Sequence, residues 1–146
     1  MVAYSFKKQF IDPIVAGLEP GPLLPGMKRQ TIRAPRRRHA RPGETMQLYA
    51  AMRTKNCRRI GVARCVAASS ITIWLPTRDQ APRIGIEAMP VDADLRIPSE
   101  LDEFAHFDGF ADFSAMADFW RANHPGVTEF TGVLIRWEPL NTEASR

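Results

Sequence analysis

The segment that says most about the fold and the site is residues 26–33, Gly-Met-Lys-Arg-Gln-Thr-Ile-Arg. Thr31 and Arg33 are two residues apart, so an extended backbone places their side chains on the same side. Lys28 lies just upstream, behind a glycine that permits a sharp turn or a close approach to a ligand. Pro35 disfavours helix at the residue before it and ends the segment. A lysine, a hydroxyl and a guanidinium so close together indicate a site for an anionic or polar ligand.

Positive charge is concentrated in this segment and in the residues that follow it. Residues 27–64 contain twelve basic residues and one acidic residue, whereas residues 87–119 contain nine acidic residues and one basic residue. Most of the cations are arginines, whose forked N–H groups match phosphate oxygens in pairs. The pattern favours a surface that binds nucleic acid or a nucleotide. The alternative is a solvated surface whose positive charges pair with the acidic side chains of residues 87–119.

Three segments show the spacing of helices. Apolar residues at positions 6, 10 and 14 predict an amphipathic helix over residues 5–16. Pro98 and Ser99 are start signals for a second, shorter helix. Apolar residues at positions 113, 116, 117 and 120 predict a third helix, which Asp112 would cap.

Alternating apolar residues predict several short strands in addition to one within residues 26–33. Such strands at close spacing, separated by turn residues, favour a mostly antiparallel barrel or sandwich. With the helices, the expected class is α+β, a small barrel with two or three peripheral helices. The predicted strands cover residues 44–50, 60–66, 71–75, 83–89 and 131–137.

Length and composition limit the function further. The 146 residues suit one domain, which we expect to cover residues 1–140, followed by a polar tail at residues 141–146. No apolar run is long enough for a membrane helix, and the first residues lack the pattern of a secretory signal. Two cysteines and three histidines, none with metal-like spacing, suggest neither a disulfide framework nor a metal site. We expect a cytoplasmic protein with no cofactor and no membrane partner.

Two residues of the basic segment could take part in catalysis. A threonine hydroxyl becomes a nucleophile when a base removes its proton, and an unprotonated lysine is such a base. Burial or nearby positive charge would lower the pKa of Lys28, and the surrounding arginines supply positive charge. Asp108 precedes a glycine at a predicted turn, where its carboxylate could point into a pocket. The alternatives are a surface lysine, an ordinary strand threonine and a turn aspartate.

The residues Gly26-x-Lys28-x-x-Thr31-x-Arg33 resemble the G-x-K-x-x-T-x-R signature of the ASCH family, a branch of the PUA-like β-barrel proteins. A second block, from Asp108-Gly109-Phe110 through a helix to a closing strand near residue 137, is similar to the family in its order. The resemblance implies a PUA-like barrel. It also implies a pocket for RNA or a modified nucleoside, formed by Lys28, Thr31, Arg33 and Asp108.

The resemblance implies three possible activities. Some ASCH proteins are thought to bind RNA, and this is our first hypothesis. Similar members are small amidohydrolases that remove the acyl group from N4-acetylcytidine, with a lysine and a threonine of the signature and a later glutamate. Lys28 and Thr31 match the first two, and Asp108 stands where the glutamate is expected. Ribonuclease activity, reported for some members, ranks last because no histidine pair or dense carboxylate cluster is present.

Further residues are candidates for contacts with the ligand. Arg33 would contact an anion or the edge of a base. Tyr49 and Trp74 are candidates to stack on an unpaired base, with a place in the core as the alternative. We assign Trp120 and Trp137 to the core, and the histidines to loops or the surface. Phosphate contacts are predicted for Arg36, Arg37, Arg38 and Arg41, and for the basic connection with Arg53, Lys55, Arg58 and Arg59.

Overall fold

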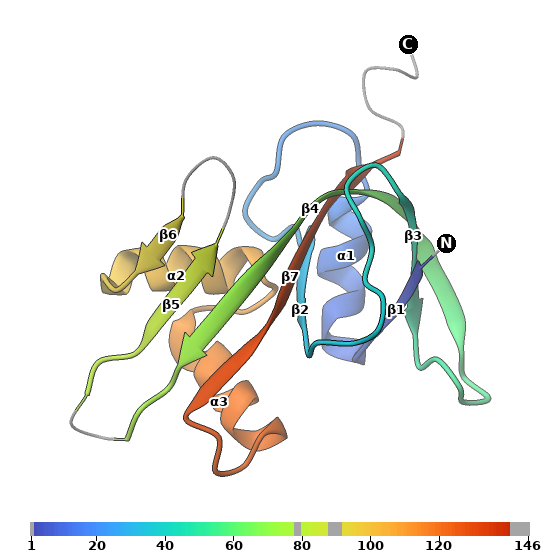
Figure 1. Cartoon of the computed structure of the whole chain (residues 1–146). Helices are drawn as coiled ribbons and strands as arrows, with labels where there is room; N and C mark the ends of the chain where they lie inside the picture. The colour runs from blue at the N-terminus through green and yellow to red at the C-terminus, as the bar shows by residue number, and fades with distance from the viewer. Residues whose placement is uncertain (1, 78–79, 88–91, 141–146) are drawn as a thin grey trace.

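The computed structural model describes residues 2–77, 80–87 and 92–140 (Figure 1). These ranges contain seven strands, three α-helices and one 3-10 turn. In chain order the elements are β1 (Val2–Phe6), η1 (Lys8–Phe10), α1 (Ile11–Gly17), β2 (Gln30–Arg33), β3 (Thr45–Ala50), β4 (Arg58–Trp74), β5 (Arg83–Glu87), β6 (Ala93–Leu95), α2 (Pro98–Phe107), α3 (Phe113–Asn123) and β7 (Glu129–Pro139).

All seven strands belong to one sheet, in which the 17-residue strand β4 is central. β3 pairs with the first half of β4, β5 pairs with its last five residues, and β7 runs along residues 63–74. β7 also pairs with β2, and β6 extends the sheet from β5. Among the described strands, only β1 and β3 pair in parallel. The expected α+β class with mostly antiparallel strands is confirmed.

The sheet does not close into the expected barrel. Strands β2, β7, β4, β3 and β1 follow one another, but no ladder between described residues joins β1 to β2. Arginine side chains bond the backbone of β1 where that ladder would run. Arg33 Nη2 donates to the Ser5 carbonyl at 2.7 Å, and Arg36 Nη2 donates to the Ala3 carbonyl at 3.5 Å. The four residues of β2 pair with β7 on their other side. We call this gap between β1 and β2 the seam.

The predicted helix over residues 5–16 is wrong in its first half. Val2, Tyr4 and Phe6 are buried and alternate with less buried residues, which is the period of a strand. The four-residue spacing of Phe6, Phe10 and Ile14 hid this pattern. The α-helix begins at Ile11, and its proline lies in the first turn, where a missing N–H breaks no helical hydrogen bond.

The middle strands also differ from the prediction. The two strands predicted over residues 60–66 and 71–75 form the single strand β4, which continues through a bulge between Cys65 and Ala67. β6 was not predicted. β5 ends at Glu87, and the last two residues of the strand predicted over 83–89 lie outside the described residues. The predicted tail at residues 141–146 also lies outside them.

The two later helices are confirmed. α2 begins at Pro98, and the carboxylate of Asp112 caps α3 by accepting from the Ala115 N–H at 2.8 Å. Both helices lie on one face of the sheet, behind β4, β5 and β6 in the view of Figure 1. Trp120 and Trp137 are buried in the core, as predicted. No helix in the described residues is long and apolar enough to span a bilayer.

Candidate functional site at the seam

Two glycines bring distant segments against Lys28. A Cβ at Gly17, the last residue of α1, would lie 2.5 Å from the Lys28 carbonyl oxygen. The Lys28 N–H donates to the Pro13 carbonyl at 2.9 Å, which also ties this backbone to α1. Gly109 follows α2 with φ +100°, and a Cβ there would lie 3.1 Å from Lys28 Cδ. The close packing around Lys28 therefore depends on glycine at both positions.

Lys28 and Asp108 form a buried ion pair. Lys28 is 3 % exposed, and its Nζ donates to the Asp108 carbonyl at 2.5 Å and lies 3.3 Å from Asp108 Oδ1. Phe10 covers the ammonium group, with Nζ 4.7 Å from the ring centroid. Burial lowers the pKa of Lys28, and the charge of Asp108 opposes that shift. Of the two expected causes, burial has the largest effect on the pKa of Lys28, and the charge of Arg33 has the smallest.

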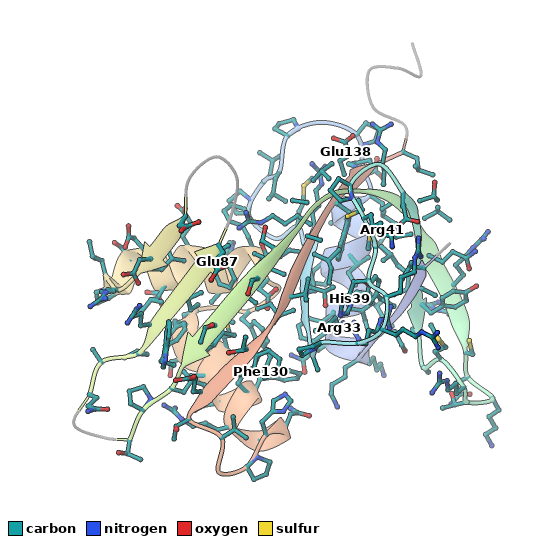
Figure 2. The ribbon with its side chains drawn as sticks, viewed as in Figure 1. Arg33, His39, Arg41, Glu87, Phe130 and Glu138 are labelled. Atoms are coloured by element: carbon teal, nitrogen blue, oxygen red, sulfur yellow. The ribbon has the colours of Figure 1, made fainter. Side chains whose placement is uncertain are left out.

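Thr31 and Arg33 lie on the same side of β2, as their spacing predicts. Arg33 Nε donates to Thr31 Oγ1 at 3.0 Å, and the guanidinium carbon lies 4.8 Å from the centroid of the Phe6 ring. Burial lowers the pKa of Arg33 to about 10. Figure 2 shows Arg33 beside His39, whose ring stacks on Tyr4.

These side chains line one cleft, which we call the seam cleft. Its volume is about 180 Å³. Lys28, Thr31, Arg33 and Asp108 all line it, so the structure brings together the four residues expected to form a pocket. Aromatic rings form much of the remaining wall: Phe6, Phe10, Phe110, Phe119, Trp120 and His124.

Gln30 belongs to the site, although no sequence signal marked it. Its Nε2 donates to Asp108 Oδ1 at 3.1 Å, so it holds the carboxylate that contacts Lys28. Burial raises the pKa of Asp108, whereas the charge of Lys28 and this hydrogen bond lower it. Strand alternation places Gln30 and Thr31 on opposite faces of β2, but both faces are covered here and both residues are buried.

Arg29 was expected to belong to the basic surface, but the structure gives it an internal role. Its Nε, Nη1 and Nη2 donate to the carbonyls of Gly17, Gly21 and Glu19, at 2.7, 2.9 and 2.8 Å. These bonds fix the loop between α1 and β2. They use the forked geometry of the guanidinium and leave it little capacity for a ligand.

The loop after β2 borders β1 rather than the seam cleft. Arg36 donates to the Arg38 carbonyl at 2.9 Å and packs on the Tyr4 ring, while Arg38 pairs with Glu44. Arg37 and Arg41 are exposed on this loop, and Figure 2 shows Arg41 well above Arg33. None of these four predicted phosphate contacts lines the cleft.

The two predicted stacking residues lie elsewhere. Tyr49 is half-buried, with its hydroxyl donating to Gln47 Oε1 at 2.5 Å. Trp74 is half-buried near the far end of β4, and its indole N–H donates to Glu129. Neither ring lines the seam cleft, whose aromatic wall comes from β1, η1, the α2–α3 connection and the C-terminal part of α3 with the residue after it. Arg53, Lys55 and Arg59 are exposed on and beside the β3–β4 hairpin.

Comparisons with protein-family models, curated proteins and solved structures find no match to this chain. Within residues 2–77, 80–87 and 92–140, no three His, Cys, Asp or Glu side chains gather as a metal site requires.

Proposed function

We propose that this chain is an ASCH-type protein of PUA-like architecture that binds RNA or a modified nucleoside, with the base in the seam cleft. The observation that carries the proposal is the buried Lys28–Asp108 pair in a cleft that also holds Thr31 and Arg33. Burying an ion pair costs desolvation energy that apolar residues would not cost. Such pairs in clefts are therefore candidates for function.

The donors in the cleft suit a nucleobase. A charged lysine has three N–H donors, and Asp108 accepts from Lys28 through its carbonyl and its carboxylate. One donor remains for a ligand. Arg33 adds further donors, and the aromatic wall offers faces for a planar ring. A base with carbonyl acceptors on one edge would accept hydrogen bonds from Lys28 and Arg33 and would stack on the aromatic side chains.

Calorimetric titration with cytidine and N4-acetylcytidine tests this proposal. We expect saturable binding, weakened about tenfold or more by Thr31→Val and by Arg33→Ala, since each removes a polar partner at the cleft. Arg37→Ala is the matched control, because that arginine is exposed and outside the cleft. Circular dichroism would show that each variant is folded. Equal binding by the three variants, or no binding by the wild type, would reject the nucleoside site.

A specific observation favours amide hydrolysis as a second candidate function. Burial lowers the pKa of Lys28, which increases its neutral fraction, and Thr31 lines the same cleft. Neutral Lys28 would accept the hydroxyl proton while Thr31 Oγ1 bonds to the acyl carbon. The C–N bond then breaks, and the leaving amine takes the proton from Lys28. Water subsequently hydrolyses the threonine ester and releases the acid.

Incubation with N4-acetylcytidine tests the hydrolase directly. Cytidine and acetate should appear together for the wild type, whereas Thr31→Ala should release neither. Thr31→Ser keeps a hydroxyl and should retain part of the activity. Turnover by Thr31→Ala equal to the wild type would exclude the threonine as nucleophile. Binding of N4-acetylcytidine without turnover would mean that the cleft binds the nucleoside and does not hydrolyse it.

A further inference from the structure

A second groove continues from the seam cleft. It has a volume of about 570 Å³ and lies between the start of α1 and the β3–β4 hairpin. Ser5, Phe6 and Lys7 line both hollows, so the two are contiguous at the end of β1. We call it the hairpin groove. Its other lining residues are Lys8, Ile11, Ala50, Ala51, Asn56 and Arg58.

The groove is positively charged and its cations are not engaged in ion pairs. Lys7, Lys8 and Arg58 are exposed, and no ion pair to any of them occurs among the described residues. No carboxylate of the described part of the chain lines the groove. By contrast, Arg38 and Arg64 on neighbouring surfaces pair with glutamates. Three such cations around one hollow match an anionic ligand.

The groove also has an apolar side. Phe6, Ile11 and Ala50 contribute carbon surface, while Asn56 offers an amide. A simple inorganic anion would make no use of this surface. A nucleotide would use both parts, because its phosphate is anionic and its base and sugar present flat or apolar faces.

We propose that the hairpin groove holds the nucleotide adjacent to the one whose base lies in the seam cleft, with the linking phosphate near Lys7, Lys8 and Arg58. The ligand is then a single-stranded nucleic acid rather than a free nucleoside. This inference rests on the proposed function of the seam cleft. It places the strand on the side of the hairpin, away from the arginines of residues 36–41.

Adjacent arginines on β4 provide a matched pair of variants. Arg58 lines the groove and lies opposite Ala50 in the β3–β4 ladder, and Ala50 also lines the groove. Arg59 lies opposite Tyr49 in the same ladder and does not line the groove. Successive residues of a strand point to opposite faces. Arg58→Ala and Arg59→Ala therefore remove the same charge from the same hairpin, on opposite sides.

The experiment compares binding of N4-acetylcytidine with binding of five-nucleotide RNA and DNA strands that carry this base at the centre. We expect a strand to bind at least tenfold more tightly than the nucleoside at low salt. Arg58→Ala and Lys8→Ala should each weaken strand binding several-fold and reduce the slope of log affinity against log salt by about 0.7. Arg59→Ala should change neither, and nucleoside binding should be unaffected by all three variants. The RNA and DNA arms identify which strand is preferred.

The other outcomes separate the two proposals. If strand and nucleoside bind equally, or if Arg58→Ala and Arg59→Ala have the same effect, the hairpin groove is not a phosphate site and the seam cleft proposal stands. If neither strand nor nucleoside binds, both proposals are rejected.

Discussion

Lys28 and Asp108 show at the scale of single residues how burial and charge oppose each other. Burial lowers the pKa of Lys28 and raises the pKa of Asp108, and in each case the partner's charge acts in the opposite direction. The unfolded chain holds the lysine proton to higher pH than the folded chain, so this residue makes stability rise with pH between its two pKa values. For Asp108 the folded chain holds the proton to higher pH. Its contribution to stability therefore falls as pH rises between its unfolded and folded pKa values.

Replacing the carboxylate should lower the pKa of Lys28 further. Asp108→Asn removes the negative charge that raises this pKa, while the hydrogen bond to the backbone carbonyl can remain. The ¹³Cε shift of Lys28, followed by NMR against pH, measures the change. Asp118→Asn, an exposed change on α3, is the control and should leave the titration unaltered. A rise in the Lys28 pKa in Asp108→Asn would contradict this account. If Lys28 is the base for hydrolysis, the rising limb of kcat/KM should move to lower pH by the same amount.

Gln30 should stabilise the folded chain through its contact with Asp108. Gln30→Leu removes the donor that lies 3.1 Å from the buried carboxylate, and we expect a loss of about 1–3 kcal/mol in the free energy of unfolding. In an Asp108→Asn background the loss should be smaller, because hydrogen bonds to charged groups are stronger.

Urea denaturation of the two single variants and the double variant measures this coupling. Gln9→Leu, on the exposed side of η1, controls for the change from amide to aliphatic side chain. Strictly additive losses would show that Gln30 does not act through Asp108.

At the scale of elements, one arginine holds the loop that joins α1 to β2. Arg29→Lys replaces three directed donors to three carbonyls with a single ammonium, which cannot reach all of them. We expect a loss of about 1–3 kcal/mol in stability, since the buried Gly17 carbonyl and the two more exposed carbonyls lose their partners. Hydrogen exchange of amides at the start of the loop, such as the Glu19 N–H that donates to the Ala16 carbonyl, should also become faster. Arg37→Lys, with an exposed side chain, should change neither value, and an unchanged exchange rate of the loop amides in Arg29→Lys would refute the anchoring role.

Elements set by local sequence could be predicted, and those set by distant contacts could not. The apolar periodicity of α3 lies within its own residues and its cap directly precedes them, so Asp112 and the apolar face were sufficient to predict this helix. β1 is a strand because it pairs in parallel with β3, more than 40 residues away. The pairing partner β3 lies far from β1 in the sequence, so no short segment around β1 reveals it. The helical spacing of Phe6, Phe10 and Ile14 begins within the same residues and favoured a helix.

The candidate site divides in the same way. Thr31 and Arg33 share a face through strand periodicity, and the resemblance to the ASCH signature pointed to Lys28 and Asp108. Gln30 and Arg29 were missed because alternation assumes one open face, whereas residues 28–31 are buried on both. Lys7 and Lys8 were missed as part of a groove because they were placed in a helix that does not form there.

For the whole molecule, the basic and acidic halves of the sequence remain apart. The basic residues belong mainly to β2, the segments on either side of β3 and the first part of β4, and the acidic residues to β6, α2 and α3, toward the other end of the sheet in Figure 1. Among the described residues, Lys28–Asp108 is the one ion pair that links residues 27–64 to residues 87–119. Within the described residues, the basic segment is therefore not neutralised by ion pairs with residues 87–119.

The arrangement of β4 predicts that the two ends of the sheet unfold together. β3 and β5 pair with separate halves of β4, and β7 spans both halves, so neither end can separate without breaking the central ladder. Urea unfolding should therefore be a single transition, with the same midpoint by far-UV circular dichroism and by tryptophan fluorescence. Trp137 and Trp74 report on different parts of the sheet, so in variants that keep one of them as the only tryptophan, fluorescence and circular dichroism of the same variant should give coincident curves. Two separate midpoints would mean that the seam end opens independently, and the site would then be held by local contacts such as Lys28–Asp108 instead of by the whole sheet.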